Sequence, residues 1–277
     1  RVFEDFLVAY RCGITPNPDV LCNREIKFDV FIQFAETLGA EYIATGHYAA
    51  RTNTEEYELH KGIDETKDQS YFLQAVPRKM LSRCLFPLAL EQKRMVRREA
   101  KSYGFSVHSK RDSTGLCFVG ERNFQEFLSK YIKQNPGPIL DASTGMTIGQ
   151  HRGLSYYTLG QRNGLQIGGL ANKPELPWYV LEKIGHDNKL IVTQDQDALN
   201  SLSLTAEDPN WLCDQVPEKC FAKTRYRQPD QACTVTAENN QIIVKFERPQ
   251  RAVTPGQYVA LYNGTRCLGG AKIVATS

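Results

Sequence analysis

The hydrophobic periodicity of the chain changes at residues 136–138, where Pro136-Gly137-Pro138 separates two unlike parts. Before this point, apolar residues recur at helical spacing over 3–10 and 28–38, and the second of these stretches leads into a short apolar run at 41–45. After it, residues 234–246 alternate about a polar turn, which is typical of a β-hairpin. The sequence therefore predicts an α/β part followed by two small β domains, the last of them barrel-like.

A length of 277 residues favours two or three domains, and we place them at 1–122, 123–196 and 203–277. Hydrophobic residues make up 41% and charged residues 23%, an ordinary globular balance that excludes a disordered chain. No apolar run approaches the roughly 18 residues of a membrane span. The chain starts at Arg1 with neither Met nor a targeting segment, so we expect a fragment or a processed protein.

Local signals predict several further elements. Asp19 is expected to cap the helix that continues through residues 28–38. Residues 68–104 are predicted to be helical with breaks at two prolines, and Phe105-Ser106-Val107 is predicted to be a strand. Lys223, Arg225 and Arg227 alternate and would share one face of a strand.

The net charge of +3 is unevenly distributed. Residues 78–111 hold ten Lys or Arg against two Glu, which gives this window a charge of +8. Such a patch is a candidate phosphate-binding surface, although a basic solvated helix face is the simpler interpretation. Residues 147–169 contain six glycines with basic and aromatic side chains, a composition compatible with RNA contact or with plain β-turns.

None of the eight cysteines forms a C-x-x-C pair, so a zinc ribbon is disfavoured and most are expected in the core. Cys22 and Cys117 are the exceptions. Cys22 would sit at the third position of a helix capped by Asp19, where the dipole favours a thiolate, although a buried core cysteine is the simpler alternative. Cys117 follows a polar loop with Gly115, and functional and core roles are balanced there.

Two further loops lie where α/β proteins bind ligands. Gly46 and His47 follow a predicted parallel strand, at the crevice edge of an open sheet. Lys67, Asp68 and Ser70 stand at a helix start, where Asp68 or Ser70 would cap the helix and Lys67 would meet phosphate.

Six motifs, in this order along the chain, resemble those of the tRNA-specific 2-thiouridylases, the MnmA family: Thr15-Pro16-Asn17-Pro18-Asp19-Val20-Leu21-Cys22-Asn23, Ala44-Thr45-Gly46-His47-Tyr48, Lys67-Asp68-Gln69-Ser70-Tyr71-Phe72-Leu73, Asp112-Ser113-Thr114-Gly115-Leu116-Cys117-Phe118, Thr158-Leu159-Gly160-Gln161-Arg162 and Thr254-Pro255-Gly256-Gln257. The resemblance implies an enzyme, a tRNA-uridine 2-sulfurtransferase, whose first domain is of the adenine-nucleotide α-hydrolase-like (PP-loop) type. ATP, with Mg²⁺, would adenylate the C2 oxygen of the wobble uridine in tRNAs for Lys, Glu and Gln, and a cysteine persulfide would supply sulfur.

The resemblance also implies roles for individual residues. Cys117 would carry the persulfide, and Cys22 would free the sulfide and close a Cys22–Cys117 disulfide. Asp19 would be a general acid/base in a target-base pocket shaped by Asn17 and Pro18, and Gly46 would contact ATP. The remaining residues would contact tRNA or fix the active-site loop: His47, Lys67, Asp68, Gln69, Arg225, Tyr226 and Gln257.

One departure from the family pattern is the lack of its Ser-Gly-Gly-Val-Asp-Ser type loop for the ATP pyrophosphate. We therefore expect a fragment that cannot adenylate tRNA alone. A persulfide-donating sulfur carrier protein or cysteine desulfurase is the expected protein partner, with no membrane partner. The bacterial cytoplasm is the expected location, with the mitochondrial matrix as the alternative.

Three other functions remain open from the sequence. The first is a non-catalytic RNA-binding protein, for which neither cysteine would matter. The second is a thiol-dependent amidase or acyl transferase pairing Cys22 with His47. The third is a related ATP-dependent RNA-modifying enzyme with a different product.

Overall fold

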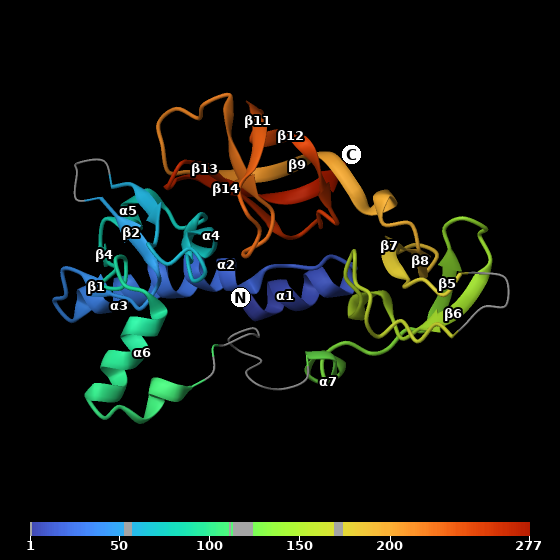
Figure 1. The fold of residues 1–277 in the computed structure, drawn as a ribbon, viewed down its shortest axis with the longest axis horizontal. Helices are drawn as coiled ribbons and strands as arrows, with labels where there is room; N and C mark the ends of the chain where they lie inside the picture. The colour runs from blue at the N-terminus through green and yellow to red at the C-terminus, as the bar shows by residue number, and fades with distance from the viewer. Residues whose placement is uncertain (1, 53–56, 111, 113–123, 169–173) are drawn as a thin grey trace.

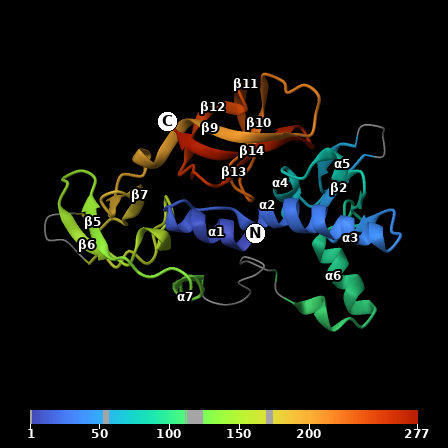
Figure 2. The ribbon, with the colours of Figure 1, turned by 180° about the vertical axis from the view of Figure 1, so that it is seen from behind.

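The computed structural model describes residues 2–52, 57–110, 112, 124–168 and 174–277. Three units follow one another along the chain (Figure 1): an α/β part, a central β domain and a C-terminal barrel. The predicted fold class is confirmed. Seen from behind, the barrel again lies above helix α1, with the α/β part and the central domain on opposite sides (Figure 2).

The α/β part contains short helices and strands: α1 (Val2–Arg11), α2 (Pro18–Cys22), the π-helical η1 (Asn23–Val30), α3 (Phe31–Thr37), β1 (Ile43–Ala44), β2 (Ala49–Arg51), β3 (Leu59–Lys61), α4 (Ser70–Leu73), α5 (Arg78–Leu81), β4 (Cys84–Leu85), α6 (Lys93–Ser102) and the 3₁₀ turn η2 (Ser106–Ser109). β1 and β4 pair in parallel, with Ile43 opposite Cys84. α2, η1 and α3 form one helical run that buries Phe28, Ile32 and Ala35 against this pair, as their spacing predicts.

The central domain comprises α7 (Phe124–Ser129), β5 (Gly137–Asp141), β6 (Thr147–His151), the 3₁₀ turn η3 (Leu154–Tyr156), β7 (Tyr179–Ile184) and β8 (Lys189–Thr193). Its four strands are ordered β6-β5-β8-β7, with β5 and β8 parallel. Helix α1 completes the core of this domain, because Phe6, Leu7 and Tyr10 pack with Phe127 and Leu128. The first helix of the chain therefore packs into the core of the central domain.

The C-terminal unit begins with the 3₁₀ turn η4 (Asp197–Leu199) and contains six strands: β9 (Asn200–Trp211), β10 (Lys219–Lys223), β11 (Gln231–Glu238), β12 (Gln241–Arg251), β13 (Tyr258–Asn263) and β14 (Arg266–Thr276). The order β13-β10-β11-β12-β9-β14, together with pairing of β13 with β14, closes a barrel. The predicted hairpin is confirmed as β11–β12, whose two turn residues Asn239 and Asn240 both have positive φ.

The α/β part joins the barrel through a shared sheet and a shared core. The β2–β3 hairpin pairs with the start of β14, with Leu59 opposite Cys267. Beneath this edge, Leu59 and Tyr71 of the α/β part belong to one apolar cluster with Tyr262 of the barrel. The two units are therefore connected by backbone pairing as well as by side-chain packing.

Three local predictions are wrong. Phe105–Val107 is not a strand: α6 ends at Ser102, and the chain turns into η2, with the His108 N–H donating to the Phe105 carbonyl. The strand through Lys223 ends at that residue, so Arg225 and Arg227 lie in the following loop. The region 68–104 contains the short strand β4 between its helices. In the described part of the chain, no helix combines the length and apolar character needed to cross a membrane.

Candidate functional site

The start of helix α2 carries the residues expected at the target base. Asn17, not Asp19, is the N-cap: its Oδ1 accepts from the Val20 N–H at 3.3 Å. Pro18 takes the first helical position, where its missing N–H costs nothing. Cys22 is therefore the fifth helical residue rather than the third. Since the dipole effect fades beyond the first turn, it supports a Cys22 thiolate less than the sequence predicts.

Asp19 and Cys22 lie three residues apart on α2 and are both half-buried. This spacing places two helical side chains on the same side, about 5–6 Å apart at Cβ. Val20 faces the other way, fully buried in a small cluster with Ala75 and Tyr258. One side of α2 is thus fixed against the α/β part and the barrel, and the other presents a carboxyl and a thiol together.

The loop before α2 contacts the barrel through Gln257. Its Nε2 donates to the carbonyl oxygens of Thr15 and Pro16 at 2.8 and 3.1 Å. Its Oε1 accepts from Asn17 Nδ2 at 3.2 Å. Gln257 therefore joins the predicted target-base pocket from the turn before β13, 240 residues after Asn17.

Gly46 and His47 follow the carboxyl end of β1, as expected for a ligand-binding edge. Gly46 is exposed, and a Cβ there would meet only the Leu88 side chain, at 3.9 Å. His47 packs on Phe28, and burial, aided by the charge of Lys27, lowers the pKa of His47 to about 4. Its imidazole is neutral at pH 7 and offers hydrogen bonds rather than a positive charge.

Gln69 fixes the same loop. Its Oε1 accepts from the Tyr48 N–H at 3.0 Å, and its own N–H donates to the Tyr48 carbonyl at 2.8 Å. Asp68 is also directed inward: it is buried and accepts from Gly62 N and from both N and Oγ of Ser70. Burial raises the pKa of Asp68, while these hydrogen bonds oppose the shift. Both side chains shape the loop in this structure.

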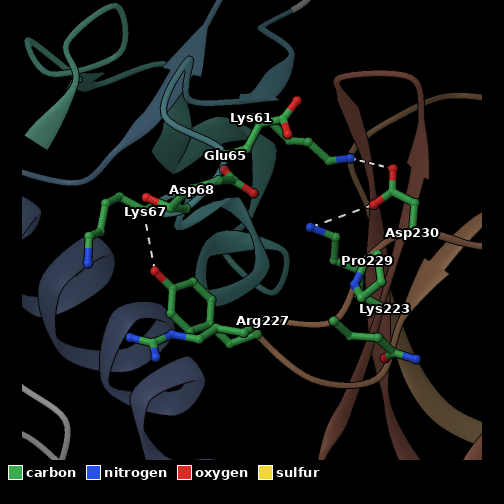
Figure 3. Close-up of a pocket in the computed structure, with 11 residues that line it drawn as sticks. Lys61, Glu65, Lys67, Asp68, Lys223, Arg227, Pro229 and Asp230 are labelled. Carbon is green, nitrogen blue, oxygen red and sulfur yellow. Dashed lines mark hydrogen bonds and ion pairs between the residues drawn. The ribbon is translucent and has the colours of Figure 1, made fainter.

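Lys67 and Tyr226 border a cavity of about 650 Å³ between the α/β part and the barrel (Figure 3). The Tyr226 hydroxyl donates to the Lys67 carbonyl at 3.3 Å. In the same cavity, Lys61 and Lys223 both pair with Asp230, at 2.5 and 3.6 Å. The lining therefore mixes cations with partly neutralising carboxylates.

Arg97 and Arg225 are two further cations near Lys67 and Tyr226. Lys67 Nζ donates to Asp112 Oδ2 at 2.6 Å, and this hydrogen bond holds the pKa of Asp112 below its usual value. Arg97 of α6 pairs with the same carboxylate at 3.0 Å. Arg225 is exposed and donates to the Ala252 carbonyl at 2.8 Å. Lys67 is thereby joined to the basic window through Asp112.

The basic window is most concentrated on α6, which has no buried residue. Figure 1 shows this helix projecting from the α/β part, away from the barrel. Arg94 and Arg98 are exposed on it. A helix that contributes nothing to the core and carries several cations is suited to a polyanionic partner.

Cys117 lies outside the described residues, so its pairing with Cys22 stays a prediction. Among the residues that the structure describes, no group of three His, Cys, Asp or Glu side chains could hold a metal ion. Mg²⁺ often relies on substrate phosphates and one or two carboxylates, and no step below depends on it.

Sequence reasoning missed several contacts at this site. Tyr71 donates to the carbonyl oxygens of Tyr258 and Thr224, at 3.0 and 3.3 Å, and so fastens α4 to the barrel. Thr158 and Gly256 also approach the loop before α2. These residues stand within quoted motifs, so the motifs located them without indicating what they touch.

Comparison with known proteins matches all three units. Residues 1–121 match the tRNA methyl transferase HUP domain, residues 125–194 the tRNA methyl transferase PRC-barrel domain, and residues 201–273 the aminomethyltransferase beta-barrel domain. The chain is 52% identical to the tRNA-specific 2-thiouridylase MnmA of Alcanivorax borkumensis, over 100% of this chain and 78% of that protein. The MnmA proteins of Hahella chejuensis and Stenotrophomonas maltophilia are 51% and 50% identical, each over 99% of this chain and over 76% and 74% of their own lengths. The chain therefore belongs to the MnmA family of tRNA-specific 2-thiouridylases.

Proposed function

We propose that the protein is a tRNA-uridine 2-sulfurtransferase that replaces the C2 oxygen of the wobble uridine with sulfur. The observation that carries this proposal is the placement of Asp19 and Cys22 three residues apart on α2, after a loop held by the barrel. Family membership supports tRNA as the substrate and ATP as the activating co-substrate. A binding protein would have no need for a carboxyl and a thiol held together in this way.

ATP would convert the C2 oxygen into a good leaving group. The oxygen attacks the α-phosphorus, pyrophosphate leaves, and the base carries an adenylate at C2. Gly46 suits contact with ATP because it is exposed at the end of β1, where added side-chain atoms would occupy ligand space. Asn17, Pro18 and Asp19 would border the base, with Asp19 moving the proton that the reaction at C2 requires.

Sulfur would arrive as a persulfide on Cys117. The Cys22 thiolate attacks the Cys117 sulfur, the bond between the two persulfide sulfurs breaks, and hydrosulfide leaves. Hydrosulfide then attacks C2 and AMP departs, so the products are 2-thiouridine, AMP and a Cys22–Cys117 disulfide. A thiol reductant restores both cysteines, and a sulfur carrier protein or a cysteine desulfurase renews the persulfide.

The tRNA would lie across the α/β part and the barrel. Lys67 and Tyr226 border the cavity at this junction, Arg225 precedes Tyr226 in the chain, and α6 adds exposed cations. Asp68, Gln69 and Gln257 are engaged within the protein, which favours the loop-fixing role that the resemblance allows. His47 is neutral at pH 7 and would meet RNA through hydrogen bonds or stacking. We propose tRNAs for Lys, Glu and Gln as substrates.

The test is nucleoside analysis of tRNA after incubation of the full-length protein with ATP, Mg²⁺ and a persulfide donor. We expect 2-thiouridine, AMP release, and loss of product of at least about 100-fold in Cys22→Ser and in Cys117→Ser. Cys12→Ser is the matched control, because Cys12 is exposed on the loop before α2 and should be dispensable. A different modified nucleoside, or full activity in both serine variants, would exclude the proposal.

The disulfide is tested separately. After one turnover without reductant, free thiols are blocked and cross-linked peptides are identified by mass spectrometry. A dominant Cys22–Cys117 peptide supports sulfur release by Cys22. Product formation without this peptide would exclude that step while leaving the overall reaction intact.

A further inference from the structure

The side chain of Gln257 makes three hydrogen bonds to the loop before α2. Both hydrogens of its amide nitrogen are used, one on the Thr15 carbonyl and one on the Pro16 carbonyl. Its oxygen accepts from Asn17. A glutamine amide has only two N–H donors, so this geometry leaves none for an outside ligand.

Gly256 shows how closely the barrel turn approaches this loop. A Cβ at Gly256 would lie 2.3 Å from Ile14 Cγ2 and 2.9 Å from the Thr15 carbonyl oxygen. Its φ of +92° is also unfavourable for any other residue. The turn therefore contacts the loop through its backbone as well as through Gln257.

The central domain contacts the same loop from another side. Thr158 Oγ1 lies 3.4 Å from Thr15 Oγ1. Two residues later, Gly160 packs against Ala252, because a Cβ at Gly160 would lie 2.6 Å from that side chain. The turn at 158–160 is thus placed against both the loop and the barrel, so all three units meet at Thr15.

Asn17 connects this junction to the reactive helix. Its Nδ2 donates to Gln257 and its Oδ1 caps α2 at Val20. An amide that donates on one side and accepts on the other has a single orientation, so Gln257 selects the orientation that caps the helix. Asp19 and Cys22 lie two and five residues further along, within the same five-residue helix.

We propose that Gln257 is a positioning residue: by holding Thr15, Pro16 and Asn17 it fixes where α2 begins, and so where Asp19 and Cys22 meet the target base. Gly256 permits the close approach that this requires. The inference rests on the proposed function for its catalytic consequence. It assigns Gln257 to the protein's own loop, with tRNA contact as the competing outcome of the test.

The experiment compares Gln257→Met and Gln257→Glu in the full-length protein. Met keeps the length of the side chain without donors, and Glu places a carboxylate against two carbonyl oxygens. Gln241→Glu is the matched control, because Gln241 is exposed at the β11–β12 turn. Thermal unfolding by circular dichroism verifies that each variant retains the barrel.

Three readouts are needed: the single-turnover rate at saturating tRNA, the Kd for tRNA, and hydrogen exchange of the peptide spanning residues 14–21. For both Gln257 variants we expect a rate lower by about 10- to 100-fold, as for misplaced reacting groups, with Kd within about twofold of wild type. Exchange at the Val20 amide should become faster. Gln241→Glu should match wild type in all three.

The outcomes separate the two proposals. A Kd that weakens at unchanged saturating rate would make Gln257 a tRNA contact and overturn the inference. Unchanged exchange would overturn it as well. Faster exchange in a protein that forms no 2-thiouridine would sustain the structural role and refute the proposed function instead.

Discussion

The barrel and the α/β part differ in how their cores are completed. The six barrel strands close on themselves, and residues such as Val244 and Val259 form a core within that unit. The α/β part has the two-stranded sheet β1–β4, and its apolar cluster includes Leu212 and Tyr262 from the barrel. The proposed reactive groups thus lie in the unit whose core depends on its neighbour, and the unit with a closed core of its own supplies the support.

Removal of Tyr262 should have the largest effect, because its fully buried ring belongs to the shared core. It also lies beneath Lys61 Nζ, 4.5 Å from the ring centroid. We expect Tyr262→Ala to lower the free energy of unfolding by about 3–5 kcal/mol in urea titrations. Phe221→Ala, at an exposed barrel position, should cost less than about 1 kcal/mol. Equal losses in the two variants would contradict a shared core.

The closure of the barrel can be tested at Gly269. Its φ is +117°, and a Cβ there would lie 2.0 Å from the Asn210 carbonyl oxygen. Gly269→Ala should therefore cost about 2–3 kcal/mol in unfolding free energy. Gly145→Ala is the matched control, since Gly145 has positive φ but an open surrounding, and should cost about 1 kcal/mol. If Gly269→Ala lowers the unfolding free energy no more than Gly145→Ala does, the barrel is less tightly closed at Gly269 than the structure indicates.

His47 should make the α/β part sensitive to acid. Its pKa falls from 6.5 to about 4 on folding, mainly through burial. Between pH 4 and pH 6.5 the unfolded chain binds more protons at His47 than the folded protein does. The stability that is linked to neutral His47 is therefore fully present above pH 6.5 and is lost as pH falls toward 4. We expect His47 to account for about 1–2 kcal/mol of the stability lost between pH 7 and pH 5.

His47→Gln should remove that part of the pH dependence in urea titrations at the two pH values. The exposed His186 provides the matched variant, His186→Gln, which should retain the wild-type dependence. Identical pH profiles for wild type and His47→Gln would show that this buried imidazole does not titrate as described.

The smallest effect on stability should come from α6, which has no buried residue. Arg94→Ala combined with Arg98→Ala should change the unfolding free energy by less than about 0.5 kcal/mol. The same variant should weaken tRNA binding and reduce the slope of log K against log salt by about 2. Lys245→Ala with Arg248→Ala removes equal charge from the barrel surface and should leave the slope unchanged. Equal slopes in both double variants would exclude α6 as the tRNA surface.

Local chemistry explains what could be predicted from the sequence. The helical run from residue 18 to 37 and the β11–β12 hairpin follow from periodicity and turn residues, which act over a few positions. The cap was misassigned because Asn17 and Asp19 are both good caps, and only Pro18 at the first helical position decides between them.

The remaining features depend on long-range contacts that leave no local pattern. Asn17 and Gln257 are 240 residues apart, and neither sequence neighbourhood indicates that they bond. The packing of α1 into the central core and the pairing of β3 with β14 are similarly set by tertiary structure. Motif resemblance singled out the candidate site residues, whereas the contact of Gln257 with the loop before α2 is visible only in the three-dimensional structure.

The pairing of β3 with β14 has a consequence for anyone who wishes to divide the chain into modules. A barrel expressed from residue 201 onward would leave Arg266 and Cys267 at an uncovered strand edge and would expose Tyr262 to water. Uncovered edges beside apolar surface invite association between copies. A segment cut from the chain at residue 201 is therefore not a unit that can be moved to another protein. The barrel should be transplanted together with the β2–β3 hairpin that covers the start of β14.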